Sequence, residues 1–183
     1  FCLPEGLLGR NSGWCYMRIF LADLGHNLVT TTSDTYPLGI ANLAVFAREY
    51  VRSPVPLDIT IYRDPQELKA ALDAGMPDVM GFSSYSWNHR LAVSFAAHVK
   101  ARSPSTVTLM GGPNFPLTED EQASWMRTMP EIDIHVRGPT YEGERAFQSL
   151  LQRFVDVGLR REGLFDEAIP GSLYVHPATG EIV

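Results

Sequence analysis

Two groups of residues suited to holding a ligand follow two short apolar runs near the middle of the chain. The groups are Ser83, Ser84, Tyr85 and Trp87 after the run 79–82, and Gly111, Gly112, Pro113 and Asn114 after the run 107–110. Hydroxyl groups can hydrogen-bond a ligand, aromatic rings can stack on it, and glycines let it approach the backbone closely. We therefore predict that both groups line a binding crevice.

The residues between the two runs indicate how the groups are positioned. From 88 to 102, apolar residues recur at helical spacing, so the pattern is strand, helix, strand. This segment is long enough for a right-handed crossover between parallel strands. Ligands of open parallel sheets bind beyond the carboxyl ends of the strands, which is where both groups fall.

The same alternation extends over most of the chain. Apolar or β-branched runs predict strands at 16–22, 57–62, 79–82, 107–110 and 132–136, and helical patterns cover 37–51, 64–75, 88–102, 118–129 and 142–155. Asp64 with Pro65 predicts one helix start, and Thr118 with Glu121 predicts another through a capping box. We expect an α/β, flavodoxin-like (Rossmann-like) three-layer sandwich with a five-stranded parallel sheet of order 2-1-3-4-5, plus a C-terminal hairpin.

The domain organisation follows from this pattern. We expect an irregular lead-in at 1–15, one domain at 16–155, and a linker and hairpin at 156–183 that lead toward a further, catalytic domain. The charged residues 156–170 form the expected linker, and 172–176 with 181–183 form the expected hairpin. Because the first residue is Phe1, we expect a processed chain or a piece of a longer one.

Composition excludes several classes of protein. The net charge of −6, with no basic run, argues against a nucleic-acid surface. No membrane span or signal peptide is visible, so we expect a cytoplasmic protein. Cys2 and Cys15 show no metal-ligand spacing, and we expect two reduced thiols.

Five further sequence pieces carry a family resemblance: 36–44, 77–88, 111–116, the Gly138 and 142–147 region, and 171–183. In this order, they resemble the cobalamin (B12)-binding domain that precedes the catalytic barrel in B12-dependent radical S-adenosylmethionine proteins. The resemblance covers about residues 16–183. It implies that Gly138 and Glu142 belong to the cofactor site.

Cobalamin-binding domains have Ser-x-Leu after the third strand and Gly-Gly after the fourth. This chain has Ser83-Ser84-Tyr85, with Tyr in place of Leu, and twenty-five residues separate this motif from Gly111-Gly112. The resemblance implies that the nucleotide tail of the cofactor slides between sheet and helices. Ser83 would then bond a nitrogen of the tail base, and a bulky side chain at Gly112 would block the tail.

One departure concerns the lower ligand of cobalt. Many cobalamin domains carry Asp-x-His-x-x-Gly after the first strand, but here Asp23 is followed by His26, one residue late, and the glycine is missing. His26 also has the simpler reading of an ordinary loop histidine, and radical S-adenosylmethionine relatives commonly lack a His ligand. The resemblance thus implies base-off cobalamin without a protein imidazole. The corrin ring would lie over a loop such as 27–33, which begins at Asn27, or over 85–87.

Several candidate site residues could instead have a purely structural role. Tyr85 and Trp87 can stack on a planar ligand or cap the end of the sheet. Asn114 and Phe115 can line the tail pocket or belong to a turn between two prolines. Glu142 and Glu144 can simply complement a helix dipole.

The resemblance implies a cobalamin-binding module that works with a radical S-adenosylmethionine barrel, in cis or in trans, with methyl transfer as the whole-protein chemistry. The S-adenosylmethionine and 4Fe-4S cluster would belong to that barrel, because these residues contain no Cys-x-x-x-Cys-x-x-Cys. We therefore expect the chain alone to be inert as a radical enzyme. The alternatives are a flavodoxin-like docking or interaction domain that binds no corrin, and an α/β enzyme that uses Ser83 or Glu142.

Overall fold

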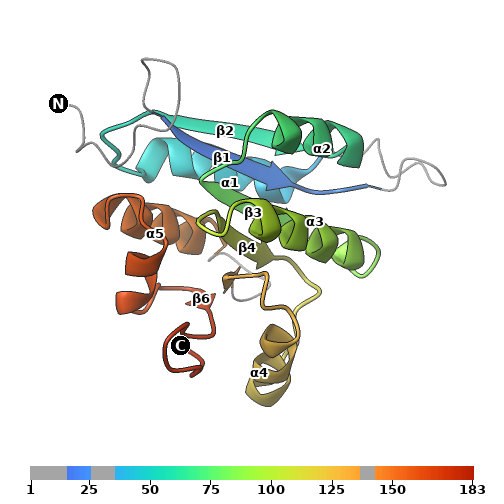
Figure 1. The fold of residues 1–183 in the computed structure, drawn as a ribbon, viewed down its shortest axis with the longest axis vertical. Coiled ribbons are helices and arrows are strands. Elements are labelled where there is room, and N and C mark those ends of the chain that lie inside the picture. Colours follow the sequence, from blue (N-terminus) through green and yellow to red (C-terminus); the bar gives the residue numbers. More distant parts are fainter. Residues whose placement is uncertain (1–15, 26–35, 137–142) are drawn as a thin grey trace.

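The computed structural model describes residues 16–25, 36–136 and 143–183, which form a sheet between two layers of helices (Figure 1). The strands are β1 (Met17–Ala22), β2 (Leu57–Tyr62), β3 (Val79–Ser83), β4 (Val107–Gly111), β5 (Ile134–Val136) and β6 (Ser172–Leu173). Their order is β2-β1-β3-β4-β5-β6. The first five strands are parallel, which confirms the predicted order 2-1-3-4-5.

The helices are α1 (Leu38–Tyr50), α2 (Pro65–Ala74), α3 (His89–Arg102), α4 (Glu119–Arg127) and α5 (Gly143–Asp156). Helices α1 and α5 share one apolar core with the sheet, and α2 and α3 share a second core on the opposite face. Trp125 of α4 lies beside His89 of α3, with their ring centroids 4.9 Å apart. None of the helices in the described ranges has the length and hydropathy of a membrane span.

Burial on both faces explains why the central strands are continuous apolar runs. In β3, Val79 packs into the core under α1 and α5, whereas Met80 and Phe82 pack into the core under α2 and α3. The same alternation places Leu109 and Met110 of β4 in opposite cores. A parallel sheet covered on both sides requires this pattern. Each large apolar side chain buried here contributes about 1.5–3 kcal/mol to the free energy of unfolding.

Both predicted helix starts are confirmed, but only one of the predicted capping contacts forms. Asp64 caps α2 as predicted, because its Oδ1 accepts a hydrogen bond from the backbone N–H of Gln66 over 2.7 Å. The capping box at α4 is wrong in its detail. The Thr118 hydroxyl donates to the Glu121 carboxylate over 2.7 Å and caps no backbone N–H. Both side chains are exposed, so their bond forms at the surface.

The C-terminal segment has a more definite place than the linker that we expected. Residues Glu162–Asp166 form a 3-10 helix, and Leu164 and Phe165 are buried in the core under α1 and α5. The predicted hairpin forms, since the backbones of Tyr174 and Val183 exchange two hydrogen bonds of 3.0 Å. Its first arm also joins the sheet, because β6 pairs antiparallel with β5. The hairpin therefore extends the sheet rather than standing outside it.

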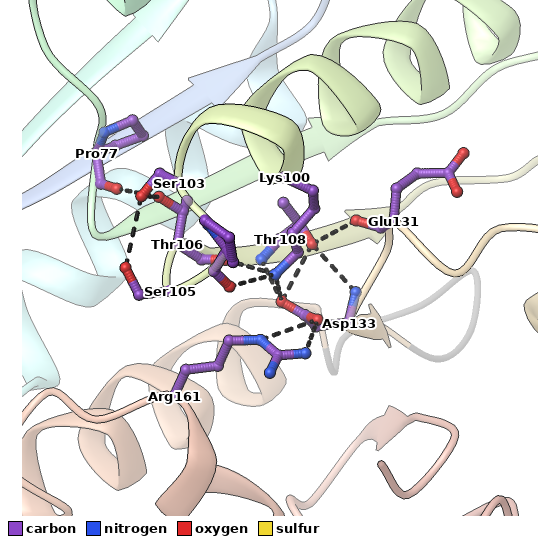
Figure 2. A network of polar contacts seen from close by, with 10 residues as sticks. Pro77, Lys100, Ser103, Ser105, Thr106, Thr108, Glu131, Asp133 and Arg161 are labelled. Atoms are coloured by element: carbon purple, nitrogen blue, oxygen red, sulfur yellow. Dashed lines mark hydrogen bonds and ion pairs between the residues drawn. The ribbon is translucent and has the colours of Figure 1, made fainter.

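The buried carboxylate of Asp133 connects the C-terminal segment to the sheet. Figure 2 shows Lys100 of α3 and Arg161 converging on Asp133, whose side chain is almost wholly buried. Arg161 Nη2 lies 2.5 Å from Asp133 Oδ1, and the backbone N–H of Thr108 donates to Asp133 Oδ2 over 2.9 Å. Asp133 precedes β5 and Thr108 lies early in β4, so this network lies at the amino edge of the sheet.

Candidate functional site

A pocket of about 710 Å³ opens at the carboxyl edge of the sheet. Its walls come from the ends of β1, β3 and β4 and from the first turns of α1 and α5. The pocket lies at the topological switch point of the sheet. There the connection after β1 leads to β2 on one side, and the connection after β3 leads to β4 on the other side. This is the location predicted from the sequence for a ligand crevice.

The interior of the pocket is mainly apolar. The apolar lining includes Leu21, Leu24, Ile40, Leu43, Leu109 and Val136. Polar and charged side chains also line it, among them Asp23, Arg63, Ser83 and Glu144. A large apolar cavity with a few polar groups is typical of a site for an organic cofactor.

Ser83 and Asp23 form a polar pair on the pocket wall. The Ser83 hydroxyl donates to Asp23 Oδ1 over 3.0 Å. The strand register explains this contact, because Ala22 pairs with Phe82 and each is followed by one member of the pair. We predicted Ser83 as a donor to a base nitrogen, but in this structure its hydrogen points to Asp23. Its oxygen remains able to accept a hydrogen bond.

Ser84 does not belong to the lining of the large pocket. It is buried, and its Oγ lies 3.0 Å from Nδ1 of His89. The sequence placed both serines in one site, but only Ser83 lines the large pocket. Ser84 instead lines a small neighbouring cavity.

Tyr85 and Trp87 lie at the rim of the pocket and stack on each other. Their ring centroids are 4.4 Å apart and the rings are within 10° of parallel. The Asn88 side chain fixes the turn, because its Oδ1 accepts from the backbone N–H of Tyr85 over 2.8 Å. Trp87 also lines the pocket and is 57% exposed.

Gly111, Gly112 and Pro113 line the pocket together. The requirement for glycine at 112 has a local cause, however. Gly112 has φ +119°, and a Cβ there would lie 2.6 Å from the backbone oxygen of Ser84. A bulky residue at 112 would thus disrupt this turn, whether or not a ligand occupies the pocket. Asn114 lines the small cavity, and its N–H donates to Ser84 O over 3.2 Å.

Four predicted site residues, His26, Asn27, Gly138 and Glu142, lie outside the described residues. Their described neighbours do line the pocket, namely Gly25 on one side and Gly143 on the other.

Two histidines near the carboxyl edge are held neutral by burial. Burial lowers the pKa of His135 to about 4, with a smaller contribution from His89. Burial also lowers the pKa of His89, with Arg90 as a second cause. Neither histidine lines the large pocket. Within the described ranges, no group of three or more His, Cys, Asp or Glu residues is arranged to hold a metal ion.

Sequence reasoning missed the contribution of α1 and the polar partner of Ser83. The missed lining residues include Asp23, Leu38, Gly39, Leu43 and Arg63. The predicted strand order contained the signal for most of them. Because β1 lies between β2 and β3, the residues that follow β1 and β2 must end beside the residues that follow β3.

The fold and this pocket define a doubly wound α/β domain with a pocket at the carboxyl edge of its sheet, which is where ligands of such domains bind. The B12 binding domain family matches residues 26–151, which is well over half of the chain. The chain therefore belongs to the B12 binding domain family.

Two curated relatives are each 37% identical to part of this chain. One is a 2-(S-pantetheinyl)-carbapenam-3-carboxylate methyltransferase from Streptantibioticus cattleyicolor, matched over 92 residues, or 50% of this chain and 12% of the relative. The other is the cobalamin-dependent radical SAM methyltransferase TokK from Streptomyces tokunonensis, matched over 75 residues, or 41% of this chain and 10% of the relative. Each match thus covers only a small part of the relative's length.

A solved structure supports the fold. It is the cobalamin-dependent S-adenosylmethionine radical enzyme OxsB with aqua-cobalamin and S-adenosylmethionine bound. The superposition has a TM-score of 0.58 and 17% sequence identity, and it covers 92% of this chain and 22% of that one.

Proposed function

We propose that this chain binds cobalamin in the carboxyl-edge pocket, as the cobalamin-binding module of a radical S-adenosylmethionine methyltransferase. The observation that carries the proposal is the 710 Å³ pocket, which is lined by the Gly111–Gly112 turn and by Ser83. Membership of the B12 binding domain family and the two methyltransferase relatives support the choice of cofactor.

The shape and chemistry of the pocket fit the nucleotide tail of cobalamin. A tail base is flat and largely apolar, and Leu21, Ile40, Leu43 and Leu109 offer it an apolar slot between sheet and α1. Helix α1 begins at the pocket without an acidic residue in its first turn. The positive end of its dipole favours an anion such as the phosphate of the tail.

The polar wall would hold the hydrogen-bonding periphery of the cofactor. With Ser83 donating to Asp23, the pair presents oxygens that accept hydrogen bonds from amide groups. Arg63 adds a cation on the same wall. We therefore assign Ser83 to the amide groups of cobalamin, in place of the base nitrogen suggested by the sequence.

We further propose that the cofactor is bound base-off, with its tail in the pocket and no histidine below cobalt. Among the residues that the structure describes, no histidine lines the pocket. The exposed indole of Trp87, supported by Tyr85, offers a flat surface against the lower face of the corrin. We therefore propose the 85–87 segment as the support of the ring.

When bound, cobalamin supplies a cobalt centre that can carry a methyl group, while the protein contributes binding and orientation. Residues 16–155 would form the binding domain, and 156–183 would lead from it toward a radical S-adenosylmethionine barrel, in cis or in trans. S-adenosylmethionine and the 4Fe-4S cluster would be held by that barrel. The chain alone should then produce no reductive cleavage of S-adenosylmethionine.

The proposal is tested by titrating the purified chain with hydroxocobalamin, followed by desalting and a visible spectrum. We expect saturable binding, colour that stays with the protein, and a base-off spectrum that His26→Ala leaves unchanged. A spectrum that changes in His26→Ala would contradict the claim that no histidine ligates cobalt, but it would leave the claim of cobalamin binding intact. Protein that stays colourless would contradict the binding and favour a docking domain of the same fold.

A further inference from the structure

A small cavity adjoins the large pocket behind the Gly111–Gly112 turn. Gly111 and Val136 line both cavities, so the turn separates them. The small cavity has a volume of about 10 Å³. This is about the space that one water molecule needs, when the volume is measured with a water-sized probe.

One residue in the wall of this cavity carries an unpartnered polar atom. His135 is only 2% exposed, and its Nε2 has no hydrogen-bond partner among the described residues. The ring stacks on Phe115, with centroids 5.3 Å apart, so it is held in place by packing. Buried polar groups in native proteins are usually satisfied by protein or by ordered water. A cavity of the volume of one water beside such an atom is therefore informative.

Two other polar residues line the same cavity. Ser84 comes from the end of β3 and Asn114 from the segment after β4, whereas His135 belongs to β5. The backbones of Ser84 and Asn114 are already joined by the 3.2 Å hydrogen bond from Asn114 N to Ser84 O. A buried water typically makes about three hydrogen bonds, and these three residues offer that number of partners.

We propose that this cavity holds one ordered water molecule, bonded to Nε2 of His135 and to polar groups of Ser84 and Asn114. The water links three strand ends behind the Gly111–Gly112 turn and fixes the wall of the large pocket. His135 is then a positioning residue for the cofactor site, and this second part rests on the proposed function. Its neutral ring at pH 7 offers a nitrogen that can accept from or donate to the water.

The water itself is tested by a crystal structure of the chain, at a resolution that shows ordered solvent. We expect density for one water within hydrogen-bond distance of His135 Nε2. An empty cavity, or a protein group on that nitrogen, would overturn the proposal. This result does not depend on cobalamin.

The positioning role is tested by two variants of His135. His135→Phe keeps the ring and its packing but loses the nitrogen, whereas His135→Gln retains a polar end that can bond the water. We expect a hydroxocobalamin Kd about fivefold weaker for His135→Phe, from the loss of about one hydrogen bond, and a near-normal Kd for His135→Gln. His98→Phe, on the outer side of α3, is the matched control and should bind normally.

If His135 had a purely structural role, His135→Phe would bind hydroxocobalamin better than His135→Gln, because phenylalanine suits an apolar core better than glutamine. A His135→Phe variant that binds as well as the wild type, or better than His135→Gln, would therefore overturn the positioning role. If the wild type itself bound no cobalamin, the proposed function would fail, and the water would still be decided by the crystal density.

Discussion

The hydroxyl of Ser83 donates a 3.0 Å hydrogen bond to the carboxylate of Asp23, which joins the carboxyl ends of β3 and β1 on the wall of the pocket. These residues are 60 positions apart in the chain, and the parallel register between the two strands brings them together. The pair is the polar feature that we assign to the hydrogen-bonding edge of the cofactor.

Ser83→Ala tests this assignment. Loss of the hydroxyl removes an acceptor from the pocket wall and leaves Asp23 without its donor, so we expect hydroxocobalamin affinity to fall about threefold to tenfold. The measurement is a visible titration of both proteins. Ser94→Ala is the control, because Ser94 lies on the exposed side of α3. Equal affinities for Ser83→Ala and Ser94→Ala would show that the pair does not contact the ligand.

Gly112 should be required by the fold itself. Gly112→Ala places a side chain at φ +119° and against the Ser84 backbone, so we expect the free energy of unfolding to fall by about 2–4 kcal/mol. Gly143→Ala is the matched control, since a Cβ at 143 meets nothing within 4 Å. Urea unfolding without cobalamin measures both. Similar stability for the two variants would contradict the close approach of Gly112 to Ser84.

The network around Asp133 should stabilise the chain far more than a similar surface network. Asp133→Ala leaves Lys100 and Arg161 without their buried partner, and we expect a loss of about 3–5 kcal/mol in the free energy of unfolding. Asp73 also binds two cations, Lys69 and Arg102, but all three are exposed. Asp73→Ala should therefore change stability little. Comparable losses in urea unfolding would contradict the account.

His135 should make stability depend on pH. Its pKa is about 4 in the folded protein and near 6.5 when unfolded, so below pH 6.5 the unfolded chain binds the extra proton. Stability should therefore fall as the pH drops from 6.5 to about 4, by about 3 kcal/mol from this residue.

The control variants isolate that contribution. Urea unfolding at several pH values should show a flatter profile for His135→Phe than for the wild type, and His98→Phe should retain the slope. The same slope in His135→Phe and the wild type would contradict a neutral buried His135.

Much of the fold could be predicted because its signals are local. The apolar run 79–82 and the helical spacing from 88 to 102 each reflect which residues of a single strand or helix are buried. The alternation of such strand and helix patterns along the chain then leads to the strand order. The place of the C-terminal segment could not be predicted in this way. The burial of Phe165 and the pairing of Arg161 with Asp133 depend on contacts between residues distant in sequence.

The position of the site could be predicted from the sequence, but the roles of its individual residues could not. Strand ends identify Ser83 and Gly111 as pocket residues, since every parallel strand ends at the same edge. Ser84 turns away because alternate residues of an extended chain face opposite sides. The hydrogen bond between Asp23 and Ser83 was missed because it depends on the register between β1 and β3, which the strand order alone does not reveal.

The most direct test of cobalamin binding in this pocket is a hydroxocobalamin titration of Gly39→Trp beside Asn42→Trp. Gly39 lines the pocket, and a Cβ there meets nothing within 4 Å, so an indole can fill the tail site without disturbing the fold. Asn42 is exposed on the same helix and does not line the pocket. We predict that Gly39→Trp loses saturable binding while Asn42→Trp and the wild type keep it. Unchanged binding by a folded Gly39→Trp would contradict the proposed location of the cofactor.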